Sequence, residues 1–141
     1  MQILSRVAAV VLAALVSVGG LSACSEGSGS GSASGAVTTV TSSDAVQVLA
    51  EPSINVIDVR TPAEFSSGHL PGAVNIDAEG SSFDQKIAGL SKTATYFVYC
   101  HSGNRSGVAT DTMAKLGFTS IYNLKGGIAD WQANGGAVVT N

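Results

Sequence analysis

Cysteine and histidine are scarce in this chain of 141 residues. There are two cysteines, Cys24 and Cys100, and two histidines, His69 and His101. Structural metal sites in proteins are built from several such ligands at close spacing. Cys100 and His101 are adjacent, but the sequence has no second group of Cys and His residues to join them. We therefore expect no metal site and no cofactor.

Basic residues are also few. Lys and Arg number 7 against 10 Asp and Glu, which gives a formal net charge of −3. Nucleic acids and anionic bilayer surfaces attract proteins through clusters of Lys and Arg. The composition therefore argues against nucleic acid as a partner.

The first residues read as a targeting segment. Arg6 is followed by an apolar run from Val7 to Val18, broken only by Ser17, and then by Gly19 and Gly20. The run is shorter than the roughly 20 residues that a membrane-spanning helix needs. A charged start, a run of this length and a small-residue exit are typical of a secretory signal peptide, here residues 1–23.

The end of this segment, Leu21-Ser22-Ala23-Cys24, resembles the lipobox of bacterial lipoproteins. The resemblance implies cleavage before Cys24 and a diacylglycerol on its sulfur; the alternative is an ordinary signal with a chance cysteine. Residues 24–36 are mostly Gly and Ser and predict a flexible tether. We expect an extracytoplasmic domain, residues 37–141, anchored by lipid to a bacterial cell envelope.

The remaining residues alternate between short β-branched runs and helical stretches. Such alternation predicts an α/β fold with a mainly parallel sheet covered on both faces. Thr41 and the capping box Thr61-Pro62-Ala63-Glu64 predict two helix starts. We expect strands at residues 36–40, 54–59, 73–76, 95–99 and 121–124, and further helices at 83–90, 106–116 and around Trp131.

Four roles are open to Cys100: a buried structural thiol, half of a disulfide, a metal ligand, or a nucleophile. A lipid on Cys24 would remove the disulfide, and a structural thiol is more usual within an apolar run than before His101-Ser102-Gly103-Asn104-Arg105. Cys100 follows an expected strand and precedes an expected helix. Backbone N–H groups there can converge on the sulfur and favour a thiolate, with Gly103 allowing a crowded backbone. Arg105 can meet an oxyanion with two parallel hydrogen bonds.

The chain resembles a single-domain rhodanese in four motifs, which occur in order over roughly residues 37 to 139. They are Asp58-Val59-Arg60-Thr61-Pro62-Ala63-Glu64-Phe65, Gly68-His69-Leu70-Pro71-Gly72-Ala73-Val74-Asn75, Tyr99-Cys100-His101-Ser102-Gly103-Asn104-Arg105-Ser106 and Gly126-Gly127-Ile128-Ala129-Asp130-Trp131. One departure is Gly136-Ala137, where many members have Gly-Pro.

The resemblance implies a five-stranded parallel sheet flanked by helices and a sulfurtransferase with a Cys100 persulfide. The outer sulfur would come from a small donor such as thiosulfate and pass to cyanide or a thiol. Backbone N–H groups from His101, Ser102, Gly103, Asn104, Arg105 and Ser106 would hold the persulfide. Asp58 and Arg60 would lie beside this loop, with Arg60 bracing it through an ion pair to Glu64 or another nearby acid. We expect Gly126-Gly127 and Trp131 to be turn and core.

Other functions remain to be weighed. Cysteine-dependent phosphatases and arsenate reductases of related fold have five residues between Cys and Arg, whereas four separate Cys100 from Arg105. The shorter loop suits one sulfur better than a tetrahedral oxyanion. A lone thiol also has no partner for two-cysteine redox cycling. A non-catalytic sulfur-carrier or binding module is the main alternative.

Overall fold

Strands and helices alternate throughout residues 35–140, the part of the chain that the computed structural model describes. The elements in chain order are β1 (Val37–Val40), α1 (Ser42–Leu49), β2 (Asn55–Asp58), α2 (Pro62–Ser67), β3 (Val74–Asn75), α3 (Phe83–Ala88), β4 (Thr95–Tyr99), α4 (Asn104–Lys115), β5 (Ser120–Leu124) and α5 (Gly127–Ala133).

The five strands form one parallel sheet in the order β1-β5-β4-β2-β3. The most apolar strand, β4, lies at its centre, where Val98 pairs in register with Ile57 of β2 and Asn123 of β5. All strands run in one direction, so their carboxyl ends lie at one edge of the sheet. The expected α/β fold with a five-stranded parallel sheet is confirmed.

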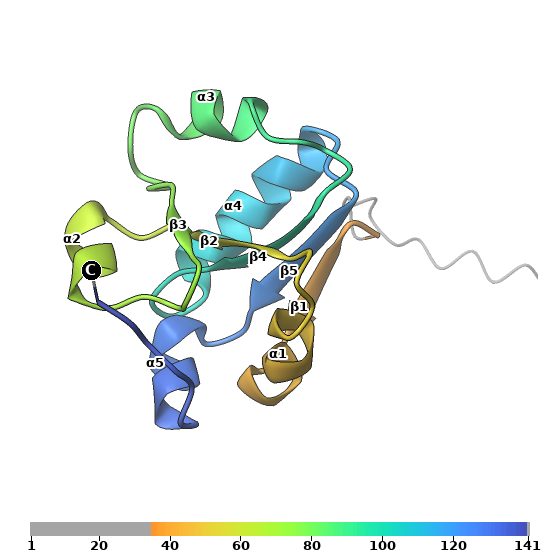
Figure 1. Cartoon of the computed structure of the whole chain (residues 1–141). Coiled ribbons are helices and arrows are strands. Elements are labelled where there is room, and N and C mark those ends of the chain that lie inside the picture. Colours follow the sequence, from red (N-terminus) through yellow and green to blue (C-terminus); the bar gives the residue numbers. More distant parts are fainter. Residues whose placement is uncertain (1–34, 141) are drawn as a thin grey trace, which may run out of the picture.

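Helices cover both faces of this sheet (Figure 1). Alternate residues of β4 point to opposite faces, so Val98 belongs to one core and Phe97 to the other. The first core includes Phe83 and Ile87 of α3 and Ala109 and Met113 of α4. The second includes Ala45 of α1 and Ile128 and Trp131 of α5. Burial of Trp131 confirms its expected core role.

Two helix starts follow the sequence signals. The Thr41 hydroxyl accepts a hydrogen bond from the Asp44 amide at 3.3 Å. Before α2, the Thr61 hydroxyl accepts from the Glu64 amide, and the Glu64 carboxylate accepts from the Thr61 amide at 3.1 Å. Both caps satisfy amides that lack partners inside a helix. The predicted capping box is confirmed.

Several element ends differ from the expectations. The helix expected at 106–116 begins at Asn104, because Gly103 turns into it with a left-handed backbone, φ 99°. No side chain caps this start, so the sequence carried no cap signal for it. The helix expected at 83–90 ends at Ala88, and the strand expected at 54–59 spans Asn55–Asp58.

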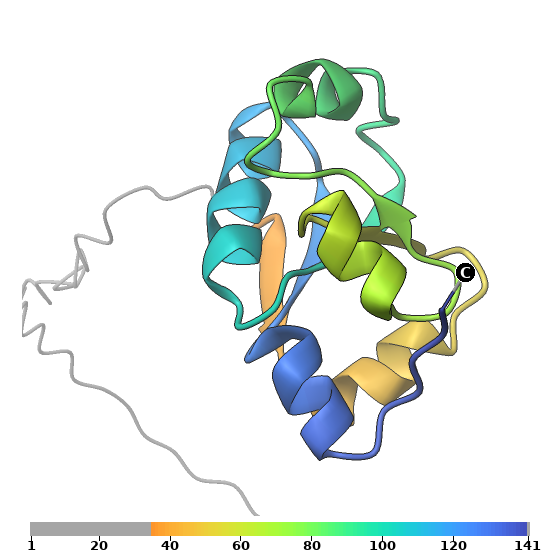
Figure 2. The same ribbon diagram turned by 90° about the vertical axis from the view of Figure 1, so that its left-hand side faces the viewer.

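The segment after α5 runs back across the molecule to the end of α2 (Figure 2). His69 and Val139 exchange two backbone hydrogen bonds there, of 2.9 and 2.8 Å, as an isolated antiparallel bridge. The small edge element that residues 135–139 could add is therefore a single bridge.

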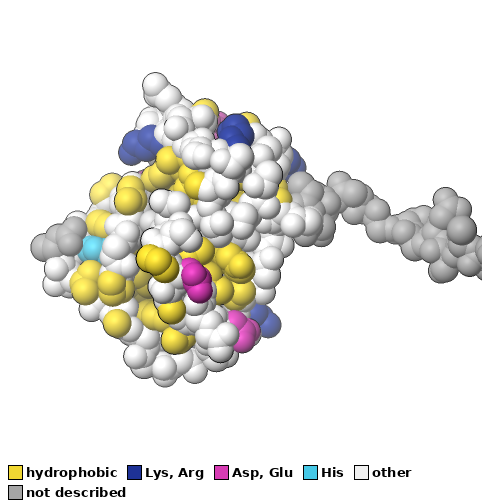
Figure 3. All heavy atoms as spheres, turned by 45° about the vertical axis from the view of Figure 1, so that its right-hand side comes forward, with side chains coloured by type: hydrophobic (Ala, Val, Ile, Leu, Met, Phe, Trp, Pro, Cys, Tyr) yellow, Lys and Arg dark blue, Asp and Glu magenta, His cyan; other side chains and the backbone are white. Residues whose placement is uncertain are grey.

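The surface carries few charges. Val46, Val74 and Val108 are each more than half exposed, and one face gathers hydrophobic side chains with few charged ones among them (Figure 3). Within residues 35–140, no helix is both long and apolar enough to cross a membrane. On such a surface, a group of charged residues around one buried thiol is a distinctive feature.

Candidate functional site

Cys100 follows the last residue of the central strand β4, at the carboxyl edge of the sheet. Its side chain is 1% exposed. The chain then turns through His101, Ser102 and Gly103 into α4, which places the sulfur beneath the amino end of that helix. We call residues 100–106 the Cys100 loop. Ligands of open parallel sheets bind at this edge, so the sequence-based position of the site agrees with the fold.

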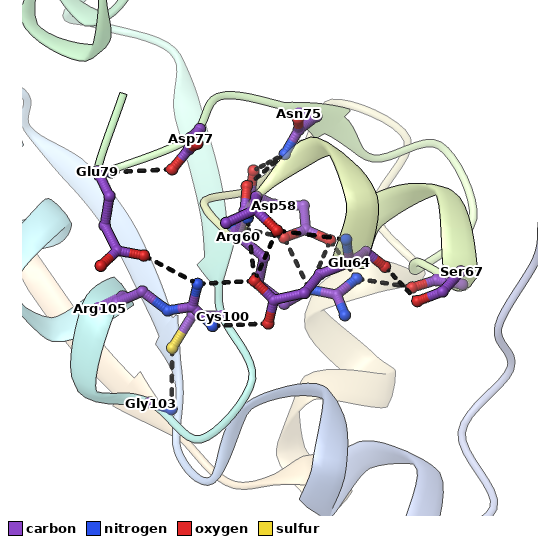
Figure 4. Close-up of polar contacts among 12 residues, drawn as sticks. Asp58, Arg60, Glu64, Ser67, Asn75, Asp77, Glu79, Cys100, Gly103 and Arg105 are labelled. Atoms are coloured by element: carbon purple, nitrogen blue, oxygen red, sulfur yellow. Dashed lines mark hydrogen bonds and ion pairs between the residues drawn. The ribbon is translucent and has the colours of Figure 1, made fainter. Parts of the chain in front are cut away.

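Hydrogen-bond donors of the loop converge on the sulfur. The Gly103 amide donates to Sγ at 3.0 Å (Figure 4), and the amides of Ser102 and Ser106 and the Ser106 hydroxyl lie close enough to favour the charged sulfur. Burial raises the pKa of the Cys100 thiol, but these neighbouring donors outweigh burial and lower the pKa below its ordinary value. Cys100 therefore ionises more readily than an ordinary cysteine.

Only part of the loop supplies these bonds. Of the six residues expected to hold the sulfur, Gly103 donates a hydrogen bond to it, and the donors of Ser102 and Ser106 help to lower its pKa. The side chains of His101 and Asn104 are exposed. The Ser106 hydroxyl also lies 3.2 Å from the Gly103 carbonyl. Because a hydroxyl has one proton, it must release that carbonyl to bond a thiolate fully.

Ser106→Ala is expected to raise the pKa of Cys100, because a donor that favours the charged sulfur is lost. The ultraviolet absorbance of the thiolate, recorded against pH as a difference from Cys100→Ser, would then rise at higher pH than in the wild type. Ser102→Ala is the matched control, since Ser102 contributes its backbone amide and the titration should not move. An unchanged titration in Ser106→Ala would mean that backbone amides alone hold the thiolate.

Arg105 does not point free into the site. Its two terminal nitrogens donate to the two carboxylate oxygens of Glu64, both at 2.8 Å, and one also contacts Glu79 at 3.3 Å (Figure 4). The hydrogen bond from Arg105 is the main reason that the pKa of Glu64 falls to about 2. The sequence predicted that Arg105 could take an oxyanion with this same pair of donors, which the structure shows already engaged.

Asp58 and Arg60 form a buried ion pair beside the loop. Asp58 ends β2 and is 0% exposed, and Arg60 is 4% exposed. Arg60 Nε lies 3.0 Å from each oxygen of Asp58, and its Nη2 lies 2.6 Å from both Asp58 Oδ2 and the Gly68 carbonyl. Burial would lower the pKa of Arg60, but Asp58 raises it above its ordinary value. Arg60 was expected to pair with Glu64 or another nearby acid, and its partner in the structure is Asp58.

Tyr99 links this ion pair to β4, the strand that carries Cys100. The Arg60 guanidinium lies 5.7 Å from the centre of its ring. Its hydroxyl accepts from the Leu70 amide at 3.0 Å and lies near the Asp58 carboxylate. Burial, followed by the Asp58 carboxylate, raises the pKa of Tyr99 far above its ordinary value, so the hydroxyl stays protonated. Arg60 braces the end of α2 against the strand that leads into the loop.

Gly127 has a role that the sequence reading missed. It starts α5 with a left-handed backbone, φ 61°, and a Cβ there would lie 2.5 Å from the Cys100 carbonyl oxygen. The next two amides, of Ile128 and Ala129, donate to the carbonyls of Cys100 and His101 at 2.9 and 3.1 Å. The amino end of α5 thus holds the back of the Cys100 loop. The one available signal was the pair of glycines before a helix, which also fits an ordinary turn.

The predicted lipidation site Cys24, the signal peptide 1–23 and most of the tether 24–36 lie outside the described residues. Within the described part, no group of three or more His, Cys, Asp or Glu residues is arranged to hold a metal ion.

Comparison with known proteins matches the family model of the Rhodanese-like domain to residues 41–134. Thiosulfate sulfurtransferase 16, chloroplastic, of Arabidopsis thaliana is 37% identical over 89 residues, which cover 56% of this chain and 74% of that protein. YrkF of Bacillus subtilis (strain 168), described as a candidate sulfur carrier, is 34% identical over 85 residues, or 60% of this chain. The chain spans about half the length of two curated B. subtilis relatives, 45% of YrkF and 59% of another.

A solved structure agrees with the sequence matches. The crystal structure of a rhodanese-related protein from Thermoplasma volcanium superposes with a TM-score of 0.65 at 30% sequence identity. The match covers 73% of this chain and 98% of that one.

Proposed function

Because the chain belongs to the family of rhodanese-like domains, we propose that it is a sulfurtransferase that carries sulfur as a persulfide on Cys100. The observation that carries this proposal is one buried sulfur of lowered pKa, which lies at the amino end of α4 and accepts a hydrogen bond from the Gly103 amide. Such donors can stabilise a negatively charged sulfur on Cys100, which is the covalent intermediate of this reaction.

The first half-reaction loads the sulfur. The Cys100 thiolate attacks the outer sulfur of a donor such as thiosulfate, the S–S bond of the donor breaks, and sulfite leaves with its electron pair. Cys100 is left with a terminal S–S⁻ group. Amides of the Cys100 loop and the positive end of the α4 dipole stabilise this charge.

The second half-reaction transfers the terminal sulfur from Cys100 to an acceptor. Cyanide or a thiolate attacks the terminal sulfur, the S–S bond on Cys100 breaks, and the thiolate is regenerated. With cyanide the product is thiocyanate. The hydrogen bonds that favour the thiolate also make Cys100 a good leaving group at this step.

Mass spectrometry of the intact protein tests this function. After mixing with thiosulfate, benzenethiosulfonate or inorganic polysulfide in separate samples, the protein should gain the mass of one sulfur atom and lose it when cyanide is added. Cys100→Ser is the control, and it should neither gain sulfur nor produce thiocyanate. Failure to gain sulfur from all three donors would overturn the proposal.

A sulfur-carrier function is the second candidate, and the similarity to YrkF supports it. A carrier would gain one sulfur on Cys100 but would form little more than one thiocyanate per protein molecule. Continued thiocyanate production with excess donor and cyanide therefore separates an enzyme from a carrier.

We further propose that Cys24 carries the lipid anchor and that residues 24–36 hold the domain outside the cell membrane. The sequence Leu21-Ser22-Ala23-Cys24 after an apolar run supports this location. In a bacterial host, the intact mass of the full chain should correspond to an acylated protein that begins at Cys24. Cys24→Ala should be recovered without acyl chains and away from the membrane, and unchanged membrane association of this variant would contradict the anchor.

A further inference from the structure

The guanidinium beside Cys100 is already paired with two carboxylates. Glu64 of α2 binds it with both carboxylate oxygens at 2.8 Å, and Glu79, from the segment before α3, adds a contact at 3.3 Å. Figure 4 shows Arg105 between these two carboxylates, with the sulfur of Cys100 next to it. An incoming anion must compete with a forked ion pair for these nitrogens.

The charges around Arg105 sum to a negative value. One cation faces two carboxylates, and the pKa of Glu64 is low enough that it stays ionised at neutral pH. The other nearby cation, Arg60, is buried against Asp58. A donor with two negative charges is therefore repelled more strongly than a donor with one.

An apolar cavity adjoins the same residues. Its volume is about 280 Å³, and it is lined by Ala78, Glu79, Asn104, Arg105 and Val108. Its wall is mostly apolar, and Val108, one turn along α4 from Arg105, is 70% exposed. Thiosulfate has no carbon group to place there, whereas an organic sulfur donor does.

On the basis of the proposed function, we propose that the sulfur donor is an organic sulfane-sulfur compound with a single negative charge, such as a thiosulfonate or a thiol persulfide. Its carbon group lies in the cavity beside Val108. Glu64 is the specificity-determining residue, because it neutralises Arg105 and so disfavours the thiosulfate dianion. With a thiosulfonate, the Cys100 thiolate attacks the outer sulfur, the S–S bond breaks, and a sulfinate leaves with the electron pair.

Methanethiosulfonate and thiosulfate test the charge argument, since they undergo the same displacement with one and two charges. The kcat/KM for each donor is measured by thiocyanate formation in wild type, Glu64→Gln and Glu79→Gln. The amide that replaces the Glu64 carboxylate keeps an oxygen for the helix cap. Removing one negative charge should raise kcat/KM about threefold for methanethiosulfonate and on the order of tenfold for thiosulfate. Glu79→Gln should act in the same direction but more weakly, because Glu79 is more exposed.

Glu51→Gln is the matched control for total charge. Glu51 is exposed in the turn before β2, at the opposite edge of the sheet from Cys100. Its removal should leave the ratio of the two kcat/KM values unchanged. Rising ionic strength should shrink the effect of Glu64→Gln, as it does for interactions between accessible charges.

Val108→Thr tests the cavity with nearly constant side-chain volume. The kcat/KM for benzenethiosulfonate should fall roughly threefold, because an apolar contact is replaced by a hydroxyl, while that for methanethiosulfonate should stay constant. Val46→Thr, at a similarly exposed valine of α1, is the control and should change neither.

The outcomes separate this inference from the proposed function. A wild-type protein that takes sulfur from none of the donors overturns the proposed function itself. An active wild type whose donor ratio is the same in Glu64→Gln overturns the role of Glu64. Equal effects of Val108→Thr on both thiosulfonates, or none on either, overturn the assignment of the cavity.

Discussion

Asp58→Ala is expected to lower the free energy of unfolding by about 3 to 5 kcal/mol, the usual cost of removing one partner of a buried ion pair. The variant leaves the Arg60 guanidinium buried without its carboxylate partner. Urea unfolding followed by circular dichroism would show the loss as a lower midpoint with an unchanged slope.

Two comparisons make this stability test specific. Arg60→Ala should lower the free energy of unfolding by a similar amount. The loss in the double variant should be close to that of the less stable single variant, because the second substitution removes the charge that the first leaves buried without a partner. Glu79→Ala removes a carboxylate from an ion pair whose acid is 64% exposed, and should cost less than about 1 kcal/mol. Equal losses in Asp58→Ala and Glu79→Ala would contradict the bracing role of the buried pair.

Gly127→Ala is expected to lower the rate of persulfide formation by at least roughly 100-fold in a protein that still folds. The added methyl group would collide with the carbonyls of Cys100 and His101, so the Cys100 loop or the start of α5 must shift. Displacements of about 1 Å at a reacting centre are known to cost this much. The rate of sulfur gain by mass spectrometry measures the effect, and circular dichroism at the same temperature reports folding.

Gly107→Ala is the matched control for this substitution. Gly107 lies within α4, and a Cβ there meets nothing within 4 Å. Alanine should raise the free energy of unfolding by about 0.5 to 1 kcal/mol and leave persulfide formation unchanged. Normal persulfide formation in Gly127→Ala would mean that the loop does not depend on its close approach to α5.

Local signals in the sequence predicted much of the fold. The apolar run Thr95–Tyr99 is the central strand β4 with the expected ends, and Thr41 and Thr61 cap the helices that follow them. These features depend on a few neighbouring residues, so spacing and residue type are enough to find them. The start of α4 was missed because the turn at Gly103 uses backbone freedom in place of a capping side chain.

The polar contacts of the site could not be predicted in the same way. The position of Cys100 follows from the order of strand, loop and helix. The pairing of Arg105 with Glu64 depends on how α2 packs against the loop, which no local pattern encodes. Arg60 meets Asp58, two residues away, because both side chains turn into the same buried space at the end of β2.

The strand order also bears on how the chain reaches its folded state. β1, the first strand, has β5 as its neighbour in the described sheet, with Val37 paired to Ile121. The sheet therefore stays incomplete until β5, more than 80 residues after β1, has emerged from the ribosome. Contacts between such distant residues slow folding and leave strand edges exposed for longer. Release of a chain that stops before β5 would leave β1 without its neighbour and favour aggregation.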